Sequence, residues 1–476
     1  MDASSHTINR IHTPLFAAAV LVLAAAGIVY PPYSTAAVLA AVLGVFLLVS
    51  RPDLAFGLFF AIETLFSEDV LLTTEKLDVT IYRVNLPFIG MNAFELAFVF
   101  LILAALIQRQ GRIAGTRLDF SVLLFGLAAL IGYLTCIRLY GDPLRLFEPR
   151  RMLHFFLSYF LAVNLIRTKA SLQGFLSLFF FAVILKSLEG AYLYLLGEGL
   201  EIKWRIRAIF TGWEDSLTFV TYLLFLGVII IGKYAFPFKR IYLLFTPVVF
   251  YTFLFSYKRA YYVALAAGLL LLFWMQGRKA KMRMAAWLLL GGVLMAGLIT
   301  VMGQWQAIGM RFESILHPTK ESSANYRLVE WQNACISIKR HPLFGIGLGG
   351  VMPMEIFLSR TNLLGVHNTY LWAAVKMGIL GFFSYVLLHI AFLRRLLRQN
   401  GALQDLYLQA VSKGIACSFA AFAAAEMFAP MFAQMRTAAW LGVMMGIGMT
   451  LPVMDGKNVE SSNDQIASKS PSTLSP

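Results

Sequence analysis

The chain contains little charge and little cysteine for its length. Of its 476 residues only 14% are charged, whereas 59% are hydrophobic. A soluble domain needs more charge on its surface, so this composition excludes a water-soluble globular protein and indicates an integral membrane protein. The three cysteines, Cys136, Cys335 and Cys417, are scattered and odd in number. They indicate neither a disulfide framework nor a metal site.

Apolar runs recur along nearly the whole chain, and a helix of about 20 residues crosses a bilayer. Together with the Lys/Arg clusters between them, they predict an all-α, polytopic fold of about 12 to 14 transmembrane helices. Because further spans follow it, the first run is predicted to be an uncleaved helix rather than a signal peptide. The predicted crossings are 14–30, 35–50, 54–66, 93–107, 119–137, 152–166, 171–197, 217–232, 241–255, 260–275, 284–302, 367–393, 406–426 and 437–452.

Basic residues gather in the short links on one side of the predicted bundle. By the positive-inside rule this side is cytoplasmic, and both termini lie there. We find no internal repeat and no soluble domain, so residues 1–452 are predicted to form a single membrane domain. Residues 453–476 are rich in serine and asparagine and are predicted to be a disordered cytoplasmic tail.

The loops on the opposite side are longer and unusually rich in arginine. Arginine opposes the topogenic signal there, and an anionic ligand is the simplest reason for its abundance. The largest of these loops, 303–366, is predicted to be partly helical, with Ser322 or Ser323 capping a helix that runs to about Arg340. The arginines on this side are Arg138, Arg145, Arg150, Arg151, Arg205, Arg207, Arg259, Arg311, Arg327, Arg340 and Arg360.

His367 is the first candidate for chemistry, because it falls where the large loop enters a span and histidine exchanges protons near neutral pH. Asn368 and Tyr370 follow it and are candidate binding residues. The alternative is an interfacial histidine that is hydrogen-bonded to a carbonyl group.

Arginines are the second candidate group, since the planar guanidinium matches adjacent anionic oxygens such as those of a pyrophosphate. Arg259 opens a span after a very short link, and Arg327 lies on the loop helix, one turn from Trp331. Arg207 and Arg311 are further candidates for binding. The alternative for each arginine is contact with solvent or lipid headgroups.

The glycine-rich segment Gly345–Gly350 has two interpretations. Its backbone amides could cradle a phosphate, or it could be a flexible link.

Charged residues also occur inside predicted spans, and we favour a structural ion pair for Lys186 and Glu189 because they are three residues apart on one helix. The other charges within spans are Glu63, Glu95, Lys376, Lys413 and Glu426. Charges within spans are also expected in a transporter or flippase for a glycolipid or anionic solute, which is an alternative function for this chain. Transporters, however, place polar groups near the midplane between two related halves, and no related halves are visible.

An ordered series of motifs resembles the core of the O-antigen ligase and polymerase family over residues 215–395. The series comprises Phe255-Ser-Tyr-Lys-Arg259-Ala, Arg327 with Trp331, Pro342-Leu-Phe-Gly-Ile-Gly-Leu-Gly, Val366-His-Asn-Thr-Tyr-Leu371 and Gly378-Ile-Leu-Gly381. One departure is that family members often have Ser-Arg directly, where this chain has Tyr257 and Lys258 between the two.

The resemblance implies a C-type glycosyltransferase that uses no metal or other cofactor and inverts the anomeric centre. It implies an undecaprenyl-pyrophosphate-linked glycan as donor and a glycan or lipid A-core acceptor, used in exopolysaccharide or lipopolysaccharide synthesis. His367 would be the essential histidine, and Arg259 and Arg327 the arginines that hold the pyrophosphate.

The implied location is the bacterial inner membrane, with the active site facing the periplasm. The implied partners are the bilayer, a chain-length regulator and a flippase, and no nucleic acid.

Overall fold

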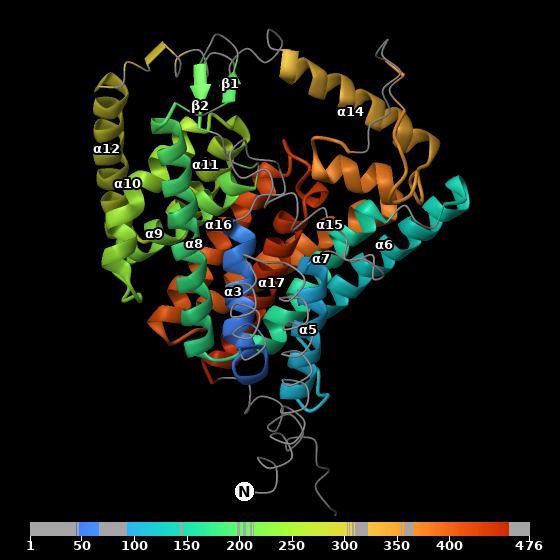
Figure 1. Cartoon of the computed structure of the whole chain (residues 1–476), viewed down its shortest axis with the longest axis horizontal. Helices are drawn as coiled ribbons and strands as arrows, with labels where there is room; N and C mark the ends of the chain where they lie inside the picture. Colours follow the sequence, from blue (N-terminus) through green and yellow to red (C-terminus); the bar gives the residue numbers. More distant parts are fainter. Residues whose placement is uncertain are drawn as a thin grey trace, which may run out of the picture.

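The computed structural model describes residues 47–65, 93–142, 146–197, 200–202, 206–209, 214–301, 322–353 and 365–456, together with a few isolated positions. In this part of the chain the structure is helical apart from one small hairpin, which confirms the all-α prediction (Figure 1). The elements are α3 (Pro52–Leu65), α5 (Ala93–Gln108), α6 (Asp119–Tyr140), α7 (Phe147–Leu165), α8 (Lys169–Leu195), β1 (Leu200–Ile202), β2 (Ile206–Ala208), α9 (Asp215–Gly232), α10 (Lys239–Phe255), α11 (Arg259–Trp274), α12 (Arg278–Val301), α14 (Ser322–Arg340), α15 (Thr369–Asn400), α16 (Leu406–Ala425), the 3-10 turn η3 (Met431–Ala433) and α17 (Met435–Met454).

Each crossing expected from 54–66 onward coincides with one of these helices. Six helices in the described part, α6, α8, α9, α15, α16 and α17, are long and apolar enough to cross a membrane, and α5 and α11 include shorter apolar helices. The chain is therefore a polytopic membrane protein, and the total of about 12 to 14 crossings stays a prediction. The expected crossing 14–30, most of the expected crossing 35–50 and residues 457–476 of the expected tail lie outside the described residues.

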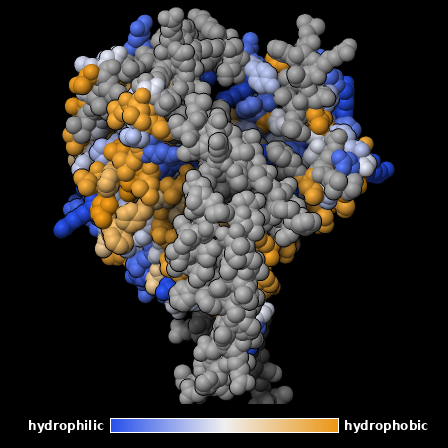
Figure 2. Space-filling view, in the orientation of Figure 1, coloured by the Kyte–Doolittle hydropathy of each residue, from blue (hydrophilic) through white to orange (hydrophobic). Residues whose placement is uncertain are grey.

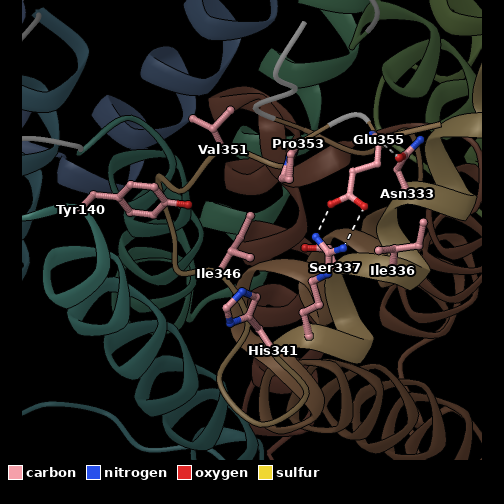
Figure 3. A pocket seen from close by; sticks show the side chains of 10 residues that line it. Tyr140, Asn333, Ile336, Ser337, His341, Ile346, Val351, Pro353 and Glu355 are labelled. Atoms are coloured by element: carbon pink, nitrogen blue, oxygen red, sulfur yellow. Dashed lines mark hydrogen bonds and ion pairs between the residues drawn. The ribbon is translucent and has the colours of Figure 1, made fainter. Parts of the chain in front are cut away.

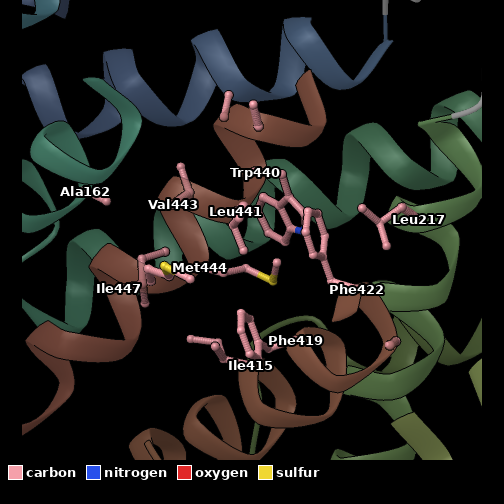
Figure 4. Close-up of a cluster of buried hydrophobic side chains, with 14 of the residues drawn as sticks. Ala162, Leu217, Ile415, Phe419, Phe422, Trp440, Leu441, Val443, Met444 and Ile447 are labelled. Carbon is pink, nitrogen blue, oxygen red and sulfur yellow. The ribbon is translucent and has the colours of Figure 1, made fainter. Parts of the chain in front are cut away.

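Helix α17 forms the centre of the bundle and packs most extensively against α7. Figure 4 shows its Trp440, Met444 and Ile447 among side chains from α7, α9 and α16. Two glycines one turn apart allow the close approach: a Cβ at Gly442 would overlap the carbonyl oxygen of Phe155, and one at Gly446 would lie 2.6 Å from the Ala162 methyl group. Small residues at this spacing let the backbones of membrane helices pack closely.

The outer surface of the bundle is apolar where lipid would cover it. Along α6 the exposed side chains recur at intervals of three or four residues, the spacing of one helical face. Hydrophobic residues also cover the flank formed by α10 and α12, at the left of Figure 2. The exposed residues of α6 are Phe120, Leu123, Leu127, Leu130 and Leu134.

The β1–β2 hairpin and α14 lie at the same end of the bundle, at the top of Figure 1. Both belong to loops that the sequence places on one side of the membrane. Their position agrees with that placement for the described parts of 198–216 and 303–366.

Several charged groups within the bundle are paired with one another. Lys186 and Glu189 lie 3.0 Å apart, which confirms the predicted intrahelical pair. Pairs between helices are Lys376–Glu148 at 2.9 Å and Arg436–Asp215. Burying an unpaired charge is very costly, so these pairs hold the helices in one arrangement.

We expect Gly442→Val to destabilise the protein by roughly 1–3 kcal/mol, because overpacking would force α17 away from α7. The measurement is thermal unfolding of the detergent-solubilised protein. Gly292→Val on α12 is the matched control, since a Cβ there meets nothing within 4 Å. Equal melting temperatures for the two variants would contradict the proposed close approach.

Candidate functional site

The loop helix predicted between Ser322 and Arg340 is confirmed as α14, and it ends just before Pro342. This helix packs against α15, the helix that follows His367. The two motifs read separately from the sequence, around Arg327 and around His367, therefore meet in space.

His367 is held by Glu330 of α14 through two groups. Its backbone N–H donates to Glu330 Oε2 at 2.9 Å, and its ring Nδ1 lies 3.1 Å from both carboxylate oxygens. A carboxylate can only accept hydrogen bonds, so it favours the tautomer with the proton on Nδ1, and this leaves Nε2 of the neutral imidazole with the free lone pair. The Glu330 side chain is fully buried while that of His367 is 38% exposed, so the pair offers a basic nitrogen on an accessible ring.

Tyr326 lies one turn before Glu330 on α14 and also contacts His367. Its ring meets the His367 imidazole edge-on, with 6.4 Å between ring centroids. Partial burial, and then the negative charge of Glu330, raise the pKa of the Tyr326 phenol. The phenol therefore stays protonated at neutral pH and can act as a hydrogen-bond donor.

The glycine segment is built into a break in α15. At Gly378 the backbone adopts φ +65° and ψ −161°, a conformation accessible essentially only to glycine. The break frees the carbonyls of Val375 and Lys376, which accept hydrogen bonds from the amides of Ile346 and Gly347 at 2.8 and 3.0 Å.

The amides of the remaining glycines in this segment are also occupied. Gly345, Gly349 and Gly350 donate to His341, Glu148 and Gly347, respectively. Residues 345–350 are buried. The segment is therefore neither a flexible link nor an open cradle of free amides, the two interpretations left by the sequence.

A buried network centred on Glu148 of α7 holds the same region. The carboxylate accepts from the Trp372 indole at 2.9 Å and from the Gly349 amide at 2.6 Å, and it pairs with Lys376. The Lys376 ammonium also donates to the Gly350 carbonyl. Three segments distant in sequence are thus joined behind the His367 loop.

Arg259 lies at the start of α11, and the link before it is tightly held. Tyr257 is 5% exposed and has φ +52°, a strained conformation for a residue with a side chain. Lys258 donates to the carbonyl of Gly212, and Ile209, just after β2, donates to the Phe255 carbonyl at 2.9 Å. The hairpin is thereby fixed beside Arg259, which is half-buried.

Arg207 belongs to this hairpin, where its backbone pairs with Glu201 of β1. The hairpin's attachment to Phe255 places its strands near the link that precedes Arg259. The backbone therefore brings two of the candidate arginines to one end of the bundle.

A buried acidic pair lies close to the start of α11. Asp215, at the first turn of α9, accepts a hydrogen bond from the amide of Gly212, whose carbonyl accepts one from Lys258, and Glu214 precedes Asp215. These acids are in turn bound by Arg436 of α17, which also donates to the carbonyls of residues 63 and 64. The half of the site around Arg259 thus rests on a buried and largely compensated charge cluster.

Two other predicted binding residues have structural partners. The Asn368 side chain caps α15 by accepting from the Leu371 amide at 3.0 Å. The Tyr370 hydroxyl donates to the Ala423 carbonyl at 3.1 Å, and its ring lies beside Tyr385. Arg311 lies outside the described residues.

Some of the loop arginines are explained by neighbouring acids rather than by a ligand. Arg150 donates to Glu95 at 2.6 Å, and Arg340 donates to Glu355 at 2.9 Å. Among the described residues, no group of three or more histidine, cysteine and acidic side chains is arranged to hold a metal ion.

Glu330 is the main site residue that sequence reasoning missed. The one feature of the sequence that could have indicated a role for Glu330 is its position on the loop helix, one turn after Arg327. A glutamate on a polar loop helix is ordinarily solvated, however. Only the approach of His367, 37 residues later, gives it a partner.

Residues 243–386 match the family model described as O-antigen ligase. The match runs from α10 to α15 and includes Arg259, Arg327, Glu330 and His367. The predicted resemblance to the O-antigen ligase and polymerase family is thereby confirmed, and together with the membrane helices it supports a membrane enzyme that ligates or polymerises glycans. A search of curated proteins finds no match.

We expect Gly378→Ala to loosen the connection between α14 and α15. Alanine at this backbone conformation costs on the order of 1–3 kcal/mol, and its Cβ would overlap the Leu343 carbonyl. The measurement is the rate of protease cleavage between residues 340 and 370, which should rise. Gly401→Ala, at φ −73° with open space around it, is the control and should leave the rate unchanged.

Proposed function

We propose that this protein transfers or polymerises a lipid-linked glycan at the periplasmic face of a bacterial inner membrane. The donor is a glycan on undecaprenyl pyrophosphate, and the acceptor is a sugar hydroxyl of another glycan or of a lipid A core. The observation that carries the proposal is the Glu330–His367 pair, in which a buried carboxylate orients an accessible imidazole within the domain matched by the O-antigen ligase family.

In the proposed reaction His367 is the general base. The acceptor hydroxyl gives its proton to Nε2 while its oxygen attacks the anomeric carbon of the donor. Glu330 holds the ring in the required tautomer and stabilises the imidazolium that forms, as a carboxylate does beside other catalytic histidines.

The bond between the anomeric carbon and the pyrophosphate oxygen breaks with the electron pair on the leaving group. Arg259 and Arg327 are proposed to stabilise this developing negative charge, and Arg207 and Arg311 to contact the donor further out. Attack from the face opposite the leaving group inverts the anomeric centre. The tightly held start of α11, which fixes the backbone of Arg259, supports the role of this arginine, and the family match that includes both arginines supports that of Arg327.

Replacing the base or either arginine is expected to abolish long-chain surface glycan without preventing membrane insertion. We expect His367→Ala to lower the transfer rate by about 10²–10⁴-fold, and Arg259→Ala or Arg327→Ala by about 10²–10³-fold. Surface glycan is measured by gel profile in a strain that lacks the wild-type gene. Arg398→Ala, exposed at the far end of α15, is the control. Wild-type glycan from all three variants would refute the site.

The same strains distinguish polymerase from ligase. Loss of a polymerase leaves single repeat units attached to the acceptor, whereas loss of a ligase leaves long chains on undecaprenyl pyrophosphate.

Glu330→Gln is expected to lower kcat by up to about 10⁴-fold and to leave the KM for the donor unchanged. The amide keeps the shape of the side chain but removes the charge that orients and stabilises the imidazolium. The measurement is steady-state transfer by purified protein in nanodiscs. Asp53→Asn, which removes a carboxylate paired with the exposed Arg51 at the start of α3, is the control. An unchanged kcat would show that Glu330 only supports the fold.

A further inference from the structure

A separate cavity of about 430 Å³ lies beyond the Glu330–His367 pair, between the C-terminal half of α14, the end of α6 and the glycine segment. Its volume falls within the range of about 300–1,000 Å³ that is usual for small-molecule sites. Figure 3 shows Tyr140 entering from one side, Asn333 and Glu355 from the other, and His341 below. His367 is not among its lining residues.

The cavity wall mixes apolar surface with uncommitted polar groups. Ile336, Ile346 and Val351 supply the apolar part. Within the described part of the chain, the Ser337 hydroxyl and the His341 ring make no hydrogen bond to protein. A ligand with both hydroxyl groups and a C–H face would satisfy both kinds of surface.

The charges at the rim cancel. Arg340 and Glu355 form a two-point ion pair, and the Glu355 backbone is fixed because its amide donates to Asn333 Oδ1 at 2.7 Å. Among the described residues that line it, the cavity therefore has no net positive charge with which to hold a phosphate, unlike the region around Arg259 and Arg327. Its chemistry favours a neutral polyhydroxyl ligand.

The position of the cavity along α14 identifies which substrate it would hold. Arg327 lies nearest the start of the helix, Glu330 comes next, and Ser337 is seven residues further on, about 10 Å along the axis. The base thus stands between the proposed pyrophosphate contact and the cavity. In a displacement reaction the donor and acceptor occupy opposite sides of the reacting centre.

We infer that this cavity binds a neutral sugar residue of the acceptor glycan, some distance from the hydroxyl that reacts. The inference rests on the proposed function and adds to it the place where the acceptor is recognised. It assigns Ser337 and His341 as hydrogen-bonding groups and Val351 as part of the apolar wall.

The cavity is filled by the substitution Val351→Trp. The matched control is Val293→Trp, at an exposed position on α12. A second cavity variant, Ser337→Ala with His341→Ala, keeps the volume largely open and removes only the polar contacts. In nanodiscs, both cavity variants are expected to raise the KM for the acceptor about tenfold or more, equivalent to about 1.4 kcal/mol. The KM for the donor and kcat at saturating acceptor should stay unchanged.

Binding is measured separately by saturation-transfer difference NMR, so that it does not depend on turnover. The probe is the oligosaccharide released by mild acid from the host's own surface glycolipid. Signal in wild type, in Val293→Trp and in His367→Ala, but not in Val351→Trp, supports the inference. Equal signal in all four proteins overturns it, as does displacement of the sugar by inorganic pyrophosphate from the wild-type cavity. A different outcome separates the two proposals. If Val351→Trp loses the binding signal but the wild-type protein transfers glycan from no lipid pyrophosphate donor, the proposed function is overturned and the sugar site is retained.

Discussion

Hydrogen bonds across the break in α15 determine where the candidate site lies. Gly378 interrupts the helix, and the amides of Ile346 and Gly347 replace the lost helical donors while Ile379 donates to Pro342. Both ends of the chain between α14 and α15 are thereby fixed to one point. Glu330 and His367 can then meet with the geometry of a carboxylate–imidazole pair.

Buried charge has a mostly structural purpose in this bundle. Lys376 and Arg436 each pair with an acid on another helix, and removing one partner from such a pair typically costs about 3–5 kcal/mol. From the sequence alone, charges inside spans suggest a solute pathway. The mutual pairing of these groups instead indicates helices locked in register, which suits an enzyme whose site lies at one end.

The sequence predicted the helices well because the bilayer imposes their length and apolar character. It also located α14, through a capping serine and Pro342, and it selected His367 and Arg327. It missed Glu330, because the partner of that carboxylate depends on tertiary approach. It left the structure of Gly345–Gly350 ambiguous. A glycine-rich segment indicates close backbone approach or flexibility, but it does not identify the group that the backbone approaches.

The order of residues along α14 suggests how one short helix can coordinate two large substrates. A rigid helix fixes the spacing between Arg327, Glu330 and Ser337 at about 1.5 Å per residue. An anionic head group and a neutral sugar chain call for opposite chemistry, and the two kinds of surface lie on either side of the residue that holds the base. Because α14 is anchored through the break in α15, a shift of that anchor would move all three residues together. In the proposed arrangement, the spacing between the donor contact, the carboxylate that holds His367 and the sugar cavity is therefore set by one helix.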